Sequence, residues 1–264
     1  MITIDVCMET VFPDLPFLER PSRIAAAGFH RLELWFPELH LPDCNFDALR
    51  MACEAVAVRI NNIVVNSPDG GIGGSLTNPA DRPKYLERMK HSLECCRELD
   101  CHMMITCTGN VQPGLSRAVQ RQSIIDGLRA GGELAGKAGV TLVLEPLNSL
   151  VDHLGYFLDD PHDAADIVRA TNHPNVGLLF DCYHMQIMRG NVIEAIRANR
   201  DVIRHFHAAG VPGRHELDSG ELSYPRIVEA IRAMGYTGCF GLEYFPAEDS
   251  AASLARMRKL LPDG

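Results

Sequence analysis

Four acidic or histidine residues each stand at the end of a short apolar run in the second half of the chain. The runs span 141–145, 176–181, 203–207 and 239–243, and they end on Glu145, Asp181, His207 and Glu243. Carboxylate oxygens and an imidazole nitrogen are ligands that a divalent cation such as Mn²⁺ or Mg²⁺ accepts. If the fold brings these four ends together, the sequence predicts a site for one divalent metal ion.

The same residue types are suited to proton transfer. A metal ion that chelates a carbonyl oxygen and a neighbouring hydroxyl lowers the pKa of the carbon acid between them. Two carboxylates placed near that carbon can then take the proton and return it. No cysteine ends any of the four runs, which argues against a structural zinc site. The pattern therefore favours an enzyme.

An alternation of apolar runs and helical stretches predicts the elements that position these residues. Between the apolar runs, apolar residues recur with helical spacing, and Gly28, Gly139 and Gly235 fit the ends of helices. Eight such units predict one (β/α)₈ TIM barrel domain over residues 1–264, whose site lies at the carboxyl ends of the strands. A doubly wound open sheet is the alternative. The runs lie at 2–8, 31–36, 59–66, 102–109, 141–147, 176–184, 203–209 and 239–245.

Several neighbours of the four run ends extend the predicted site. His184 follows Asp181 by three residues, and a neutral imidazole there could bond a substrate oxygen. Arg214 could clamp a carboxylate or a sugar hydroxyl. Glu216 could bind substrate or hold Arg214, and the sequence does not separate these roles. Glu33, on the second predicted strand, is expected to support the site, and Asn148 is expected to shape the turn after the fifth.

The composition of the chain limits the classes of binding partner and the cellular compartment that we expect. The chain has 264 residues and a formal net charge of -9, which disfavours a nucleic-acid backbone or an anionic membrane as partner. Its nine cysteines are odd in number and form no C-x-x-C pair, so free thiols in a reducing compartment are expected. No signal peptide and no apolar run of membrane-spanning length is visible, so we expect a cytoplasmic protein.

Four motifs surround the predicted site residues: Leu144-Glu-Pro-Leu-Asn-Ser149, Phe180-Asp-Cys-Tyr-His-Met-Gln186, Ala209-Gly-Val-Pro-Gly-Arg-His-Glu216 and Gly241-Leu-Glu-Tyr244. Together they resemble the sugar isomerase/epimerase superfamily of xylose isomerase-like barrels. The chain is most similar to its hydroxypyruvate isomerase-like subgroup, which includes 2-oxo-tetronate isomerases. The resemblance implies metal binding by Glu145, Asp181, His207 and Glu243, and proton transfer between Glu145 and Glu243 through an enediol-like intermediate. It also implies a small sugar or sugar-acid substrate and Mn²⁺, Mg²⁺ or Co²⁺ as the ion.

One residue departs from the subgroup's pattern. The position of His207 is usually Gln in hydroxypyruvate isomerase-like proteins, whereas ketose 3-epimerases usually have His. Conversely, epimerases carry a carboxylate six residues after the first metal-binding Glu, where this chain has Val151. The leading hypothesis is an isomerase of a hydroxy-keto acid or ketose, and the nearest alternative is a ketose 3-epimerase. A metal-dependent endonuclease and a non-catalytic sugar-binding barrel are the alternatives from other classes. We further expect a homo-oligomer, a dimer or a tetramer.

Overall fold

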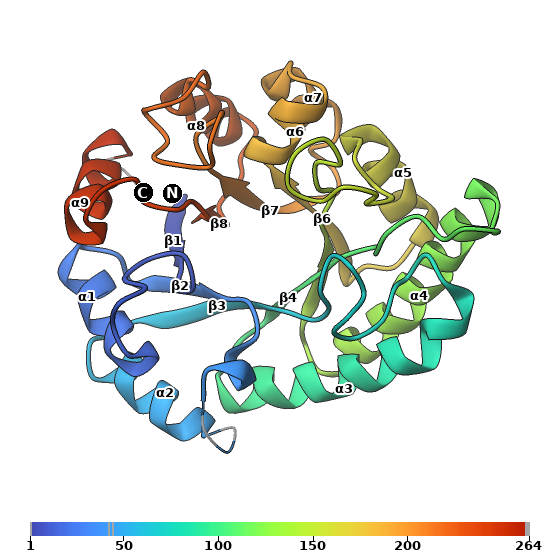
Figure 1. Cartoon of the computed structure of the whole chain (residues 1–264), viewed down its shortest axis with the longest axis horizontal. Helices are drawn as coiled ribbons and strands as arrows, with labels where there is room; N and C mark the ends of the chain where they lie inside the picture. Colours follow the sequence, from blue (N-terminus) through green and yellow to red (C-terminus); the bar gives the residue numbers. More distant parts are fainter. Residues whose placement is uncertain (1, 42, 44, 262–264) are drawn as a thin grey trace.

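Eight parallel strands close into a barrel in the computed structural model, which describes residues 2–41, 43 and 45–261. Each strand pairs with the next along the chain, and β1 pairs with β8 to complete the ring, so the alternative of an open sheet is wrong. Figure 1 shows the closed ring of strands. The strands are β1 (Thr3–Cys7), β2 (Arg31–Leu34), β3 (Arg59–Val64), β4 (Met103–Thr106), β5 (Thr141–Leu144), β6 (Val176–Asp181), β7 (Ile203–Ala208) and β8 (Cys239–Leu242).

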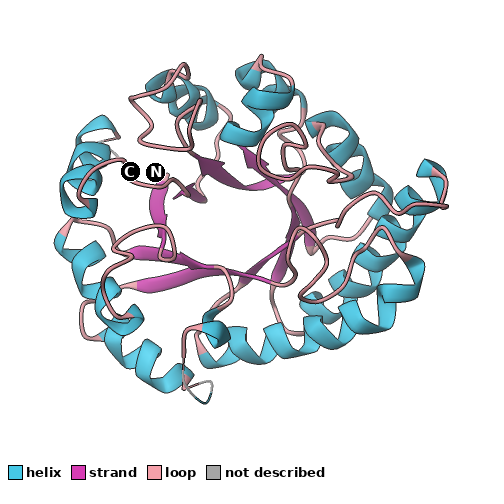
Figure 2. Cartoon of the chain, viewed as in Figure 1, coloured by secondary structure: helices cyan, strands magenta, loops and turns pink. Residues whose placement is uncertain are grey.

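Helices surround the barrel, as Figure 2 shows. At least one α-helix follows each strand among the described residues, and β6 is followed by two. This order confirms the predicted (β/α)₈ architecture. The α-helices are α1 (Arg20–Ala26), α2 (Phe46–Glu54), α3 (Arg82–Glu98), α4 (Arg117–Lys137), α5 (Pro161–Thr171), α6 (Cys182–Met188), α7 (Val192–Ala198), α8 (Tyr224–Ala233) and α9 (Ser250–Leu260), and the 3₁₀ helices are η1 (Phe17–Glu19), η2 (Pro37–Leu39) and η4 (Pro79–Asp81).

Alternating side chains along the strands serve two separate cores. Leu142 and Leu144 of β5 belong to the large core that the strands share with the helices. Val143, between them, packs instead with Ile105 of β4 and Leu179 of β6 in a small separate cluster. Successive side chains of a strand point to opposite faces, so this cluster fills the inside of the barrel.

The connections between strands and helices include one predicted feature and one long loop. The predicted helix-ending glycines Gly28, Gly139 and Gly235 follow α1, α4 and α8, and each has a positive φ, which confirms them as helix ends. The long segment 66–79 is tied to the end of β4: Asn66 Nδ2 donates to the carbonyl oxygen of Cys107, and the backbone N–H of Thr77 donates to the carbonyl oxygen of Thr108. No helix of the described residues is long and apolar enough to cross a membrane.

Candidate active site

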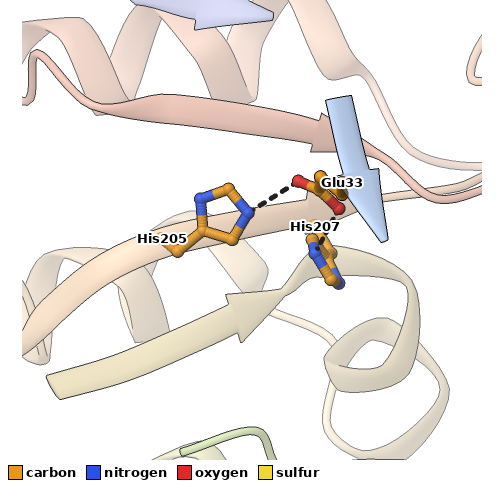
Figure 3. Close-up of side chains that lie close together, drawn as sticks. All are labelled: Glu33, His205 and His207. Carbon is orange, nitrogen blue, oxygen red and sulfur yellow. Dashed lines mark hydrogen bonds and ion pairs between the residues drawn. The ribbon is translucent and has the colours of Figure 1, made fainter. Parts of the chain in front are cut away.

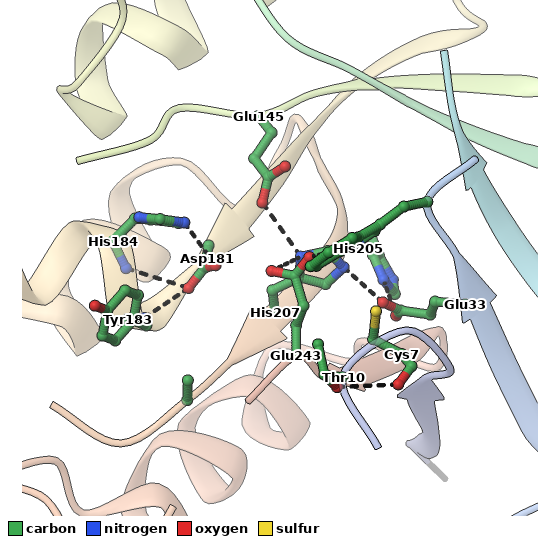
Figure 4. A network of polar contacts seen from close by, with 12 residues as sticks. Cys7, Thr10, Glu33, Glu145, Asp181, Tyr183, His184, His205, His207 and Glu243 are labelled. Atoms are coloured by element: carbon green, nitrogen blue, oxygen red, sulfur yellow. Dashed lines mark hydrogen bonds and ion pairs between the residues drawn. The ribbon is translucent and has the colours of Figure 1, made fainter. Parts of the chain in front are cut away.

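The four predicted metal ligands converge at the carboxyl ends of four neighbouring strands. Each offers one ligand atom, and these atoms all lie within 4.8 Å of one another. Asp181 is the last residue of β6, Glu145 and Glu243 directly follow β5 and β8, and His207 lies within β7. All four side chains are buried. Figure 4 shows them pointing toward a common centre.

His207 lies at the middle of this cluster. Its Nδ1 is 3.2 Å from Glu145 Oε1 and 3.4 Å from Glu243 Oε2, and its Nε2 is 2.8 Å from Glu33 Oε2. Burial alone would lower the pKa of His207, but the carboxylates of Glu33 and Glu243 outweigh burial and raise this pKa well above its usual value. The Nδ1 side of the ring therefore faces the candidate ligands, and the Nε2 side faces Glu33.

Asp181 also begins a helix. Its Oδ1 accepts hydrogen bonds from the backbone N–H groups of Tyr183 (2.7 Å) and His184 (3.2 Å), which caps α6. This contact fixes the carboxylate and leaves Oδ2 without a backbone partner. Burial raises the pKa of Asp181 to about 7, although the charge of His207 opposes the change. A carboxylate tethered in this way presents its second oxygen in a defined direction.

Glu243 is held by two side chains besides His207. Trp35 donates from Nε1 to Glu243 Oε1 at 2.7 Å, and the Arg214 guanidinium forms an ion pair with Oε2. Burial would raise the pKa of Glu243, but Arg214 and His207 outweigh burial and hold the pKa below its usual range. Burial raises the pKa of Glu145, although His207 opposes the change. The two glutamates therefore have different electrostatic surroundings.

The donor set fits one hard divalent cation. Glu145, Asp181 and Glu243 supply carboxylate oxygens, and His207 supplies a nitrogen on the same side. Three buried carboxylates at this separation repel one another, and a divalent cation among them would offset that repulsion. Cys107 lies nearby, but its sulfur is not one of the converging ligand atoms. This chemistry suits Mn²⁺ or Mg²⁺ better than a thiolate-bound zinc.

A cavity of about 200 Å³ lies next to the cluster. Its wall combines charged groups with apolar and aromatic surface, and the residues that line it are Trp35, Phe36, Val64, Pro68, Cys107, Glu145, Leu147, His153, His184, Arg214 and Glu243. Such a mixture is typical of small-molecule sites, in which a few polar groups orient a ligand. Arg214 is the only lysine or arginine among the lining residues.

His184, which lines this cavity, has one ring nitrogen without a hydrogen-bond partner in the described part of the chain. Its Nδ1 accepts from the backbone N–H of Asn148 at 3.2 Å, so the proton of a neutral ring lies on Nε2. Burial lowers the pKa of His184 well below its usual value, which keeps the ring neutral. Nε2 is buried and has no hydrogen-bond partner in the described part of the chain. Asp181 Oδ2, at 3.6 Å, is beyond hydrogen-bond distance.

The structure separates Glu216 from the other predicted substrate-binding residues. Glu216 Oε1 accepts hydrogen bonds from Ser253 Oγ (2.7 Å) and from the backbone N–H of Ala247 (3.1 Å), and Glu216 does not line the cavity. Arg214 forms an ion pair with Glu243 rather than with Glu216. The contacts of Glu216 tie the loop after β7 to the start of α9.

Asn148 shapes the turn after β5, as the sequence predicts. Its Oδ1 accepts from the backbone N–H groups of Val151 (3.0 Å) and Asp152 (2.9 Å). The turn brings Asp152 Oδ2 to within 2.8 Å of the Tyr183 hydroxyl. The Val151 side chain is exposed. A carboxylate is therefore present near this edge of the site, one position later than in the epimerase pattern.

Sequence reasoning missed Trp35 and Asp152. Trp35 directly follows β2. A search for polar side chains at the carboxyl ends of all predicted strands, and not only of the last four, would therefore have found it. It is the one tryptophan of the chain, and it contacts both a candidate catalytic residue and the cavity. Asp152 lies in a turn and ends no apolar run, so no comparable pattern pointed to it.

A parallel (β/α)₈ barrel with charged and polar side chains gathered at the carboxyl ends of its strands has the architecture of a TIM-barrel enzyme. A family model described as "Xylose isomerase-like TIM barrel" matches residues 21–260. The chain belongs to this family.

Two relatives and one solved structure extend over nearly the whole chain. A Xenopus laevis protein, named provisionally as a hydroxypyruvate isomerase, is 30% identical over 95% of this chain and 93% of its own. The 2-oxo-tetronate isomerase of Cupriavidus necator is 30% identical over 96% of both chains. A crystal structure described as AP endonuclease, family 2, from Brucella melitensis is 29% identical, covers 98% of this chain and 99% of its own, and superposes with a TM-score of 0.90.

Proposed function

We propose that this chain is a metal-dependent isomerase of a small hydroxy-keto acid or ketose, of the hydroxypyruvate or 2-oxo-tetronate type. The observation that carries the proposal is the convergence of Glu145, Asp181, His207 and Glu243 beside a small cavity. Full-length similarity to relatives named for such isomerases supports the substrate class. That the chain is an enzyme acting on a sugar or sugar acid does not depend on which substrate carbon is deprotonated.

Glu145, Asp181, His207 and Glu243 would hold one Mn²⁺, Mg²⁺ or Co²⁺ ion. When bound, the ion supplies Lewis-acid polarisation of substrate oxygens, which acidifies the neighbouring C–H bond. The protein's own part is then to place acid/base groups on that carbon.

Glu145 and Glu243 are the groups that we assign to proton transfer. They follow β5 and β8, both line the cavity, and they approach the cluster from different strands. One carboxylate takes the proton from the substrate carbon as an enediolate forms, and a proton returns to the neighbouring carbon from the other carboxylate. Their different pKa directions fit two groups with different roles.

His184 and Arg214 are the proposed substrate-binding residues. His184 offers a single N–H to a substrate oxygen that develops negative charge, and its neutral ring acts as a donor only. Arg214 lies over the Tyr183 ring at 5.3 Å, which fixes the guanidinium at the cavity wall. A substrate carboxylate would find its cationic partner there.

A ketose 3-epimerase remains the second candidate, and His207 favours it. The two reactions differ in where the proton returns: the neighbouring carbon for an isomerase, or the opposite face of the same carbon for an epimerase. An endonuclease is disfavoured because the net charge is -9 and the converging rim ligands suffice for one ion, whereas that chemistry needs a basic groove and several metals.

A substrate panel tests the proposal. Hydroxypyruvate, 2-oxo-tetronates, pentuloses and hexuloses are incubated with the enzyme and Mn²⁺ in D₂O, and the products are resolved by chromatography. We expect a carbonyl moved by one carbon, with deuterium incorporated at the carbon that was protonated. An inverted stereocentre with an unmoved carbonyl would identify the epimerase. Absence of turnover on all four classes would contradict both.

A further inference from the structure

A second carboxylate network lies beneath the candidate metal site, inside the barrel. Glu33 of β2 is 2% exposed, and its two oxygens contact two different histidines of β7. Glu33 Oε1 lies 2.8 Å from His205 Nε2, and Oε2 lies 2.8 Å from His207 Nε2. Figure 3 shows the carboxylate between the two rings. Burying a charge costs desolvation free energy, so we expect a buried carboxylate that bridges two imidazoles to have a structural or functional role.

A missing side chain on β8 leaves room for this bridge. Gly241 pairs in register with His207. A Cβ at Gly241 would lie 2.8 Å from both Glu33 Cδ and His207 Cδ2, a distance that real Cβ atoms essentially never show. Its φ is not positive, so the backbone does not require glycine there. Glycine at this position therefore serves the contact between the Glu33 carboxylate and the His207 ring.

The bridge determines which nitrogen of His207 carries a proton. A bare lone pair on Nε2, 2.8 Å from a carboxylate oxygen, would be repelled, so Nε2 must be protonated even though its N–H is not aligned on that oxygen. A cation that displaces the proton from Nδ1 would leave a neutral ring whose Nδ1 lone pair points at that cation. Nδ1 is the atom that faces Glu145 and Glu243. The tautomer and the ring orientation both depend on Glu33.

We propose that Glu33 is a positioning residue that binds the Nε2 sides of His205 and His207 and thereby presents His207 Nδ1 to the cation. This inference rests on the proposed metal site and adds the atom through which His207 acts. His205 serves as the fixed second anchor of the carboxylate, since its Nε2 holds the oxygen that His207 does not use. A carboxylate anchored at both oxygens cannot rotate away from His207.

Cation affinity of matched variants tests the proposal. Glu33→Gln keeps the shape but offers one acceptor oxygen to two N–H donors, and it is expected to weaken Mg²⁺ and Mn²⁺ binding at least about 10-fold in calorimetry. Glu9→Gln is the matched control. Glu9 is also a buried carboxylate near the rim, but it bonds the Trp35 backbone and Cys7 rather than His207, and we expect its affinity to be unchanged. Wild-type affinity in the folded Glu33→Gln protein would overturn the proposal.

Nitrogen-15 imidazole spectra of the wild type give a second readout that does not depend on a variant. With saturating Mg²⁺, and with His207→Asn for assignment, we expect His207 to show a protonated Nε2 and an unprotonated Nδ1. A protonated Nδ1 would overturn the proposal. If the wild type binds no divalent cation, the proposed function itself fails. If the wild type binds but Glu33→Gln binds equally well, only the role of Glu33 fails.

Discussion

The two candidate catalytic glutamates differ in how firmly they are held. Glu243 has a partner on each oxygen, Trp35 and Arg214, whereas the carboxylate of Glu145 contacts His207. Equal residue types at matched strand ends therefore occupy unequal environments. Such inequality is what an enzyme needs when one carboxylate must accept a proton and another must give it.

Replacing either glutamate by glutamine should stop proton transfer. Glu145→Gln and Glu243→Gln each keep a neutral oxygen ligand but lose the proton acceptor, so kcat should fall at least about 100-fold. Steady-state kinetics at saturating Mn²⁺ measures the loss, and metal analysis of the same samples shows whether the ion is retained. Wild-type turnover in either variant would remove that glutamate from the mechanism.

Glu9 is expected to make the free energy of unfolding depend on pH, without any contribution from the candidate metal ligands. Burial raises its pKa to about 7 from an ordinary 4.5, despite the hydrogen bond from the Trp35 backbone N–H. The folded state therefore binds this proton more tightly than the unfolded state does, so Glu9 stabilises the fold less as pH rises from about 4.5 to about 7. The linked change is at most on the order of 3 kcal/mol.

Glu9→Gln should remove that dependence. Urea unfolding of metal-free protein at pH 5 and pH 8 is expected to show the variant gaining stability relative to the wild type at pH 8. Gln keeps an acceptor for the Trp35 N–H, so the packing change is small. A wild-type and variant difference that stays constant across this range would show that Glu9 does not titrate there.

At the scale of elements, one carboxylate serves both the fold and the site. Asp181 ends β6 and caps α6 through Oδ1. Asp181→Asn keeps the capping oxygen but removes the charge, so the metal-free variant should keep its unfolding free energy and lose cation affinity. Asp181→Ala should lose affinity and also about 1 kcal/mol of stability, because the cap is gone. Denaturant unfolding compares the two, and equal destabilisation would show that the cap contributes nothing.

The alternation of apolar runs and helical periodicity was enough to predict the barrel and the convergence of four side chains at its rim. Parallel strands bring their carboxyl ends to one rim, so Glu145, Asp181, His207 and Glu243 met as expected. The prediction for Glu216 failed to place it in the cavity because loop geometry directs its carboxylate to Ser253. Loop conformation depends on tertiary contacts that no periodicity records.

The contacts of Glu33 with two histidines were also not predictable from the sequence. Its position on a strand was visible in the sequence, but its contact with His205 and His207 joins β2 to β7 across the barrel. Strand register and the absence of a side chain at Gly241 decide that contact. Neither follows from the spacing of residues along one strand.

For the whole molecule, one rim surface exposes a group of apolar side chains. Leu150, Val151 and Leu154 of the loop after β5 are 62%, 62% and 74% exposed, and Val111 of the loop after β4 is 48% exposed. A β-bridge between Asn110 and Tyr156 joins the two loops. Exposed apolar residues that adjoin one another are typical of subunit interfaces. We therefore predict that the expected homo-oligomer forms through this surface.

Charge placed on this rim surface should disrupt the oligomer. Leu150→Asp combined with Leu154→Asp is expected to shift sedimentation velocity profiles toward the monomer, because association would bury two carboxylates. Leu39→Asp is the matched control, since Leu39 is 65% exposed on η2 and lies outside this surface. A monomeric wild type, or a double variant with wild-type sedimentation, would contradict the prediction.

The central claim is that the four strand ends form one site for a divalent cation. Calorimetric titration of Mn²⁺ into metal-free wild type and His207→Ala tests it most directly, and Trp35 fluorescence can follow the same titration because this single tryptophan contacts Glu243. We predict one ion per wild-type chain, a fluorescence change that saturates at the same stoichiometry, and at least about a 10-fold weaker affinity in the folded variant. No binding by the wild type, or equal binding by His207→Ala, would contradict the account.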